Sequence, residues 1–319
     1  MNEPWRSLLV VIGTLITVVL VVMFNVFLER RIVARWQDRR GPNRVGPFGL
    51  LQLIADVIKL FTKDDWVPRF ADRPVFVMAP TVVMITGILS FSVIPFAPRI
   101  GIVDLNIGLL FFFAMSSMAV YSVVLGGWAS NSKYSLLGGM RAAAQMLSYE
   151  VFLALSLAGV VALSGSFNLR DIVAAQEKHG WFIVPQILGF FVFLIAGIAE
   201  THRLPFDLPE ADSELIAGYH SEYSSMKFGM FFVGEYVGIT LISAMIVTLF
   251  FGGWLGPGLP PITWFIIKTF FFICLFFLLR ATLPRPRFDQ LMAYGWKAML
   301  PLSLLNLAIT GGLMLATGY

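Results

Sequence analysis

The sequence predicts an all-α polytopic membrane protein, and three observations support this fold class. Hydrophobic residues make up 58% of the 319 residues, and the mean hydropathy is +0.80. Charged residues make up only 13%, whereas soluble domains carry about 25%. Apolar runs of about 20 residues, the length that crosses the hydrocarbon core of a bilayer, recur along the chain. We therefore expect a single integral membrane domain over residues 1–319.

Eight such runs are candidate transmembrane helices. The first contains about 21 apolar or small residues and is not followed by a small-residue cleavage site, which favours a membrane span over a signal peptide. The Gly and Pro residues inside several runs are tolerated in lipid-embedded helices. The predicted spans are 8–28, 76–97, 107–128, 142–163, 182–200, 228–251, 263–283 and 298–317.

Lys and Arg residues are distributed unevenly between the connections. The connections after the first, third, fifth and seventh spans carry 18 of them, the opposite side carries 4, and Lys268 lies inside a span. Because positive residues concentrate on the cytoplasmic side of a membrane, we expect these four connections on the inner face and both termini on the outer side.

The first inner loop, residues 29–75, contains a different kind of helix. Its segment GPNRVGPFGLLQLIADVIKLFTKDDW begins with Gly and Pro residues that are typical of turns. The apolar residues from Leu50 to Phe61 then recur at helical spacing. This stretch is too short and too charged to cross a bilayer, which indicates an interfacial amphipathic helix. A simple surface anchor is the alternative interpretation.

Two carboxylates, Glu150 and Glu235, lie inside predicted spans. Each is roughly 12–13 Å along its helix from the inner end, near the middle of the membrane. A charge at this depth is unfavourable and typical of ion or proton pathways, and burial favours proton uptake by a carboxylate. The adjacent Tyr149 and Tyr236 fit a proton relay. The alternative is that a buried Arg or a hydroxyl satisfies each acid and that the acids only join helices.

Lys268 is a further polar residue inside a span. It lies roughly 9 Å from the predicted outer end of its helix. It is either functional or positioned so that its ammonium group reaches the interface.

The inner loop 200–227 is rich in acids. In AETHRLPFDLPEADSELIAGYHSEY, Asp207, Pro209 and Glu210 predict the start of a helix, because acids and Pro favour the first turn. Glu200 and Arg203 are spaced to pair on a helix. The other acids predict an anionic vestibule that continues to Glu235 and Glu150 as a path of carboxylates. A solvated acidic loop is the alternative.

Several motifs together resemble one known family. They are AETHRLPFDLPEADSELIAGYHSEY, GPNRVGPFGLLQLIADVIKLF, RAAAQMLSYEVFLALS, FFVGEY and PRPRFDQLMAYGWKAMLPL. In this order they resemble the membrane-embedded H subunit family of the proton-pumping NADH–quinone oxidoreductases, the respiratory complex I that includes mitochondrial NADH dehydrogenase subunit one. The resemblance runs from Glu29 almost to the C-terminus. Asp212 departs from it, because the family more often has Glu there.

The resemblance implies that the chain is one subunit of an enzyme in the bacterial inner membrane. It implies a quinone chamber and its entrance, with quinone as substrate, and a row of carboxylates that couples quinone reduction to proton translocation. NADH, FMN and the iron–sulfur clusters would be on partner subunits. These partners would be the peripheral quinone-site and iron–sulfur subunits and the small and antiporter-like membrane subunits, in a lipid environment and without nucleic acid. The implied coupling residues are Glu150, Glu200, Glu210, Asp212, Glu214, Glu222 and Glu235, and the implied chamber or entrance residues are Arg30, Asp56 and Arg280.

The cysteine content agrees with redox cofactors that are held on partner subunits. The single cysteine, Cys274, excludes a disulfide framework, a zinc cluster and a self-contained iron–sulfur site. We expect no metal site on this chain. Two alternatives remain: the anchor subunit of a related membrane-bound hydrogenase or ferredoxin-linked complex, and an autonomous ion transporter. GPNRVGPFGLLQ favours the quinone branch, and the sequence has no visible repeat of the kind many transporters contain.

Overall fold

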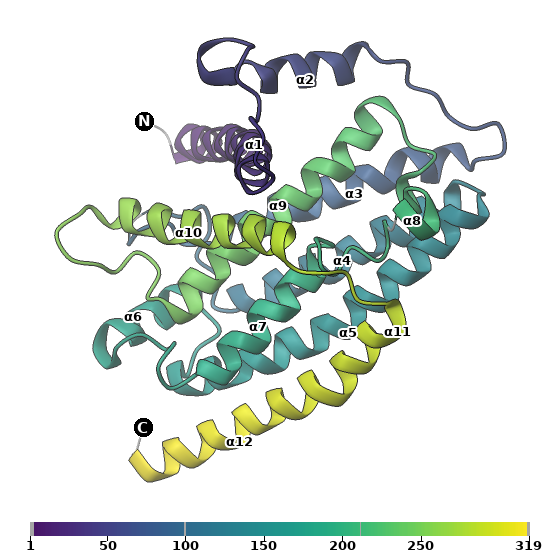
Figure 1. The fold of residues 1–319 in the computed structure, drawn as a ribbon. Coiled ribbons are helices and arrows are strands. Elements are labelled where there is room, and N and C mark those ends of the chain that lie inside the picture. The colour runs from purple at the N-terminus through teal and green to yellow at the C-terminus, as the bar shows by residue number, and fades with distance from the viewer. Residues whose placement is uncertain (1–2, 99, 211, 318–319) are drawn as a thin grey trace.

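The computed structural model describes residues 3–98, 100–210 and 212–317, and this part of the chain is helical, with no strand (Figure 1). The all-α prediction is therefore confirmed. In chain order the elements are α1 (Glu3–Trp36), η1 (Pro47–Gly49), α2 (Gln52–Thr62), α3 (Arg73–Phe91), α4 (Gly108–Ala129), α5 (Lys133–Ser164), α6 (Leu169–His179), α7 (Ile187–Glu200), α8 (Asp212–Leu215), η2 (Gly218–His220), α9 (Ser225–Phe250), α10 (Pro261–Thr282), α11 (Phe288–Tyr294), a π-helical turn η3 (Gly295–Met299) and α12 (Leu300–Thr317).

Within the described ranges, seven helical segments are long and apolar enough to cross a membrane. They correspond to seven of the eight predicted spans. The fifth predicted span, 182–200, is helical only over the 14 residues of α7. Such a helix is roughly 21 Å long, shorter than the ~30 Å hydrocarbon core. The count of eight crossings stays a prediction.

Several helices differ in length from the predicted spans. α1 continues through Trp36, and α5 begins at Lys133 rather than at residue 142. The difference arises because hydropathy marks only the apolar part of a helix, whereas the hydrogen-bonded backbone continues into polar surroundings. α3 is shorter than predicted and ends at Phe91. Pro95 disfavours helical geometry at the residue before it, and the chain turns there.

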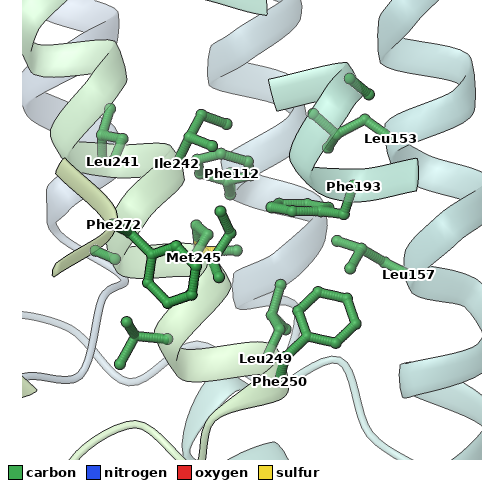
Figure 2. Close-up of a cluster of buried hydrophobic side chains, with 14 of the residues drawn as sticks. Phe112, Leu153, Leu157, Phe193, Leu241, Ile242, Met245, Leu249, Phe250 and Phe272 are labelled. Carbon is green, nitrogen blue, oxygen red and sulfur yellow. The ribbon is translucent and has the colours of Figure 1, made fainter. Parts of the chain in front are cut away.

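α9 is the central helix of the bundle. It packs against α1, α3, α6, α7 and α10, and 72% of its apolar window is buried. Figure 2 shows its Leu241, Ile242, Met245, Leu249 and Phe250 meeting side chains from four other helices. Those partners are Phe112 of α4, Leu153 and Leu157 of α5, Phe193 of α7 and Phe272 of α10. Polar residues on α9 are therefore placed inside the protein rather than toward lipid.

The four connections that were predicted to share one face meet at one end of the bundle, here called the α2 end. The first loop bonds to the end of α4 through Asp72 N–H and Ala129 O (3.0 Å). It also pairs with the start of α9 through Asp65 and Lys227 (2.6 Å). The 201–224 loop reaches the segment after α10 through Asp207 and Arg285. The side of the membrane on which this end lies stays a prediction.

α2 is the helix that was predicted to be amphipathic, and its existence is confirmed. In Figure 1 it lies beyond the end of α1, beside α9, with which it is in contact. None of its residues is buried, and Ile54, Ile58 and Phe61 are exposed. This exposed apolar face agrees with a position at a lipid interface, which stays a prediction.

Candidate functional site

A cavity of about 100 Å³ lies inside the bundle, between α3, α4, α7 and α9. Because a water molecule takes ~30 Å³ in the liquid, the cavity has room for a few waters. Its wall is mainly apolar, yet it includes two of the predicted coupling carboxylates, Glu200 and Glu235. The other polar lining residues are Thr86, Ser90, Ser116, Thr201, His202 and Tyr219.

Two successive serines of α4 bind two carboxylates from neighbouring helices. Ser116 Oγ donates a hydrogen bond to Glu200 Oε1 (2.9 Å), at the end of α7. Ser117 Oγ donates to Glu150 Oε1, near the middle of α5. The two carboxylates are close enough to interact electrostatically. Glu200 Oε2 is buried without a hydrogen-bond partner among the described residues. Hydroxyl groups rather than a cation therefore hold this pair of acids.

A series of buried and partly buried charges, here called the charge cluster, joins α10, α1, the 201–224 loop and α9. Arg203 Nη2 lies 3.0 Å from Glu235 Oε2, and Arg203 Nη1 lies 3.6 Å from Glu29 Oε1. Arg280 forms an ion pair with the same oxygen of Glu29. The guanidinium of Arg203 also lies over the ring of Tyr236, 4.3 Å from its centroid. The side chains of Glu29, Arg203 and Glu235 are 6%, 8% and 10% exposed, so their charges are poorly screened by solvent.

The predicted pairing of Glu200 with Arg203 is wrong. α7 ends at Glu200, and His202 has a left-handed backbone conformation (φ 51°). The two side chains therefore do not share a helical face. Arg203 instead points to Glu29 and Glu235, and Glu200 accepts its hydrogen bond from Ser116.

Glu210 and His202 border the charge cluster. The carboxyl group of Glu210 lies against that of Glu235; burial and this neighbouring charge raise the pKa of Glu210 well above its usual range. In its protonated form the carboxyl group of Glu210 can donate a hydrogen bond to its neighbour. Burial lowers the pKa of His202 to about 4, so its imidazole is neutral at pH 7.

The helix predicted to start at Asp207–Glu210 does not form there. Residues 208–210 are a turn, and α8 covers only four residues, Asp212–Leu215. Asp207 is held by Arg285 (2.7 Å) instead of capping a helix. The loop folds tightly on itself: a Cβ atom at Gly218 would lie 1.8 Å from the carbonyl oxygen of Pro209, and Gly218 has φ +58°. Only glycine fits this position.

The remaining predicted loop acids lie in different surroundings. Glu214, whose side chain is 46% exposed, pairs with Arg141 of α5 (2.6 Å). Glu222 is half-buried in the turn after η2. The side chain of Asp212 lies outside the described part of the structure. Glu210 thus points inward to Glu235, whereas Glu214 points outward to a cation.

The three predicted chamber residues come together around the end of α1. Arg30 of α1 pairs with Asp56 of α2 (2.6 Å), and Arg280 of α10 pairs with Glu29. Burial acts to raise the pKa of Asp56, but the charge and hydrogen bond of Arg30 lower it below its usual value overall. Because Glu29 and Arg30 are consecutive, the two ion pairs lie next to each other.

The ammonium group of Lys268 binds backbone carbonyl oxygens at the C-terminal end of α9. Its ammonium donates to the carbonyl oxygens of Phe251, Gly253 and Leu255 (2.7, 3.2 and 2.6 Å). It also lies 4.7 Å from the ring centroid of Trp181. Carbonyls at a helix C-terminus lack partners within the helix and carry negative partial charge. Lys268 therefore caps the C-terminal end of α9 and does not line the cavity. Its position relative to the membrane interface stays a prediction.

Three residues of the site, Glu29, Arg203 and His202, were not predicted from the sequence as site residues. Glu29 directly follows an apolar run, where a charge is usually taken as the end of a span. Arg203 is the only Arg between six nearby acids, which was a usable signal for a buried partner. No group of three His, Cys, Asp or Glu side chains that could hold a metal ion occurs among the residues the structure describes.

Comparisons with known proteins agree with these features. A family model described as NADH dehydrogenase matches residues 9–311. The H subunit of the NADH-quinone oxidoreductase of Methylococcus capsulatus is 63% identical over 308 residues, which cover 96% of this chain and 97% of the relative. With its apolar helices, the chain is a multi-pass protein of the bacterial inner membrane. It belongs to the H subunit family of the NADH-quinone oxidoreductases and is one subunit of that enzyme.

Proposed function

We propose that this chain forms part of the quinone chamber and its entrance, and that it couples quinone reduction to proton translocation. The electrons come from redox centres on partner subunits. Membership in the H subunit family favours this function over a hydrogenase anchor or an autonomous transporter. In this proposal the coupling residues are Glu210, Glu235, Glu200 and Glu150, whereas Glu214 and Glu222 lie nearer the mouth of the path.

The observation that carries the proposal is the cavity between α3, α4, α7 and α9. It connects Glu235, which belongs to the charge cluster, with Glu200, which belongs to the serine-bound pair. A few waters in this space would complete a hydrogen-bonded route between the two carboxylates. Glu210 extends the route toward the α2 end, and Glu150 extends it from Glu200.

The position of Arg30, Asp56 and Arg280 supports the chamber. They surround the end of α1 at the α2 end, where the loops that would face partner subunits also gather. The exposed apolar residues Ile54, Ile58 and Phe61 of α2 suit contact with an isoprenoid tail or with lipid. The cations Arg30 and Arg280 suit a headgroup that gains negative charge on reduction.

The charge cluster provides a physical basis for coupling. Reduction of a quinone to a quinol takes up two electrons and two protons. Negative charge that develops near Arg280 competes with Glu29 for that cation. Glu29 then draws Arg203 more strongly, and Glu235 loses part of its ion pair. A buried carboxylate that loses its cation takes up a proton. That proton passes from the adjacent carboxyl groups of Glu210 and Glu235 to the cavity and to Glu200.

The test uses the assembled enzyme in sealed vesicles with Glu235→Gln. Gln keeps the shape of the side chain but cannot carry a proton or pair with Arg203. We expect the ratio of protons translocated to electrons transferred to fall at least several-fold. Measuring this ratio with NADH and a soluble quinone separates coupling from electron transfer.

Glu177→Gln in α6 is the matched control, because Glu177 is exposed and lies away from the cavity. It should leave the ratio unchanged. If Glu235→Gln assembles and translocates protons with the wild-type ratio, the coupling role of this carboxylate is wrong.

A further inference from the structure

A second hollow, of about 480 Å³, opens at the end of α1 and into the loop after it. It is separate from the cavity and shares none of its lining residues. Four arginines line it, Arg31, Arg35, Arg39 and Arg40, together with the apolar Leu28 and Ile32. This hollow is not part of the proposed proton route. We call it the arginine hollow.

The positive charge of the arginine hollow is not balanced by its own lining, which includes no acid. Among the described residues, no carboxylate oxygen lies within 4.0 Å of any of the four guanidiniums. The nearest partners are uncharged: Arg39 Nε donates to Gln37 Oε1 (2.8 Å), and Arg31 lies 5.0 Å from the ring centroid of Phe27. All four side chains are exposed. The hollow is therefore suited to an anion.

The chemistry of the lining favours a phosphate group. A guanidinium presents a fixed fork of N–H donors that pairs with two oxygens of a phosphate at once. Arg31 and Arg35 are four residues apart on α1, so they project from the same face of the helix. Arg39 and Arg40 approach from the loop, which returns closely to the helix. A Cβ atom at Gly41 would lie 3.1 Å from the Cα of Arg31.

The depth of the arginine hollow agrees with the headgroup layer of a bilayer. The apolar run of α1 ends at Leu28. Arg31 lies roughly 4.5 Å beyond this residue along the helix axis, and Arg35 roughly 10 Å beyond it. Each headgroup layer is about 5–7 Å thick. The backbone of Arg31 therefore falls within the layer. That of Arg35 lies roughly 3 Å beyond it, a distance that its long side chain can span.

The hollow also continues into an apolar surface. Leu28 and Ile32 line it on α1. On the same helix, toward the membrane centre, Phe24 is 42% exposed and Leu20 is 59% exposed. A free phosphate ion would not use this surface, whereas the acyl chains of a lipid would lie along it.

We propose that the arginine hollow binds the phosphate group of an anionic phospholipid, whose acyl chains lie against the exposed face of α1. The proposal does not depend on the coupling role of the carboxylates. It rests on four unbalanced arginines, with Arg31 at headgroup depth, next to an exposed apolar helix face.

The test uses the assembled enzyme, stripped of loosely held lipid in detergent and titrated with phosphatidylglycerol. Retained lipid is quantified by mass spectrometry. Arg31→Gln with Arg35→Gln should weaken phosphatidylglycerol binding at least tenfold. The matched control is Arg69→Gln with Arg73→Gln, which removes two exposed charges of the first loop and the start of α3 outside the hollow. It should change binding less than twofold.

Two further measurements identify the ligand. Phosphatidylcholine and inorganic phosphate, added as competitors at equal concentration, should not displace phosphatidylglycerol. Arg31→Lys with Arg35→Lys keeps the charge but not the forked geometry, and it should bind with intermediate affinity. This variant also provides the measurement if the glutamine variant does not assemble.

Three outcomes would overturn the proposal. One is unchanged phosphatidylglycerol binding in both the glutamine and the lysine variants. Another is displacement by inorganic phosphate, which would indicate a free-anion site. The third is unchanged lipid content with loss of a partner subunit, which would indicate that an acidic polypeptide occupies the hollow.

Discussion

Two buried polar clusters lie in the same helical bundle but differ in how well their hydrogen bonds are satisfied. One, here called the amide cluster, joins α7 to α12. Gln186 Nε2 donates to Thr310 Oγ1 (2.6 Å), Asn306 Nδ2 donates to Gln186 Oε1 (2.8 Å), and Gly189 N–H donates to Asn306 Oδ1 (3.1 Å). The other is the charge cluster of Glu29, Arg203, Glu235 and Arg280.

The amide cluster is neutral, and its amide groups are paired with one another. In the charge cluster, Glu29 Oε2 and Arg203 Nε are buried without hydrogen-bond partners among the described residues. A neutral, satisfied network stabilises helix packing. A buried ion pair is weak evidence for stability, because desolvation offsets much of its attraction. The difference indicates that the amide cluster stabilises the packing of the helices, and it supports the coupling role proposed above for the charge cluster.

The largest expected effect breaks the charge cluster at its centre. Arg203→Met would leave Glu29 and Glu235 buried with less positive charge, a change that costs about 3–5 kcal/mol. We expect little assembled enzyme in membranes, measured by native gel electrophoresis and by NADH-dependent quinone reduction. Arg203→Lys, which keeps the charge, should recover assembly in part. Wild-type amounts of fully active enzyme with Met at this position would contradict the role given to the cluster.

The next change breaks the amide cluster. Asn306→Leu would leave Gly189 N–H and one oxygen of Gln186 unpaired, at a cost of about 1–3 kcal/mol. The thermal midpoint of the enzyme should fall, while the proton-to-electron ratio stays at the wild-type value. Combining it with Gln186→Leu should cost less than the sum of the two single changes, because fewer groups remain unpaired. An altered ratio in the single variant would remove the distinction between the two clusters.

The pH dependence of stability gives a third test. The pKa of His202 is lowered from its usual value of 6.5 to about 4. The folded state therefore favours the neutral form, and its stabilisation is complete above pH 6.5 and decreases as the pH falls toward 4. At pH 5 the loss is about 2 kcal/mol. His202→Phe should lose less stability between pH 7.5 and 5, measured as the shift in thermal midpoint. Equal shifts in the variant and wild type would mean that His202 does not titrate in this way.

The smallest expected effect concerns the ion pair between α1 and α2. The Arg30 side chain is 43% exposed, so solvent screens its pair with Asp56, and such pairs contribute about 0.2–1 kcal/mol. Arg30→Gln should lower the thermal midpoint only slightly. Because Arg30 lowers the pKa of Asp56, the variant should also lose less stability than wild type when the pH falls below about 4. A large loss at neutral pH would place Arg30 in a more buried network than the structure describes.

The sequence was sufficient for features that depend on local composition. Apolar runs predicted the helices, and the spacing from Leu50 to Phe61 predicted α2. Glu150 and Glu235 could be found because a charged residue inside an apolar run usually has a functional role. These signals are contained in about 20 consecutive residues and do not require knowledge of packing.

Other features depend on contacts between distant segments, which a single sequence does not contain. The spacing of Glu200 and Arg203 suggested a helical pair, but a turn after α7 directs Arg203 to residues that are 174 and 32 positions away. Asp207 had the pattern of a helix cap, but Arg285 provides a stronger charged partner. Glu29 was overlooked because the helix continues past the end of the hydrophobic run.

The final turns of α1 have a structural consequence. Glu29 faces the protein interior and holds Arg203 and Arg280, whereas its neighbour Arg30 reaches outward to α2. One peptide unit thus connects a solvent-facing helix to the buried Arg203 and the partly exposed Arg280. A ligand bound at α2 would therefore lie one residue of backbone away from the charge cluster without entering the interior.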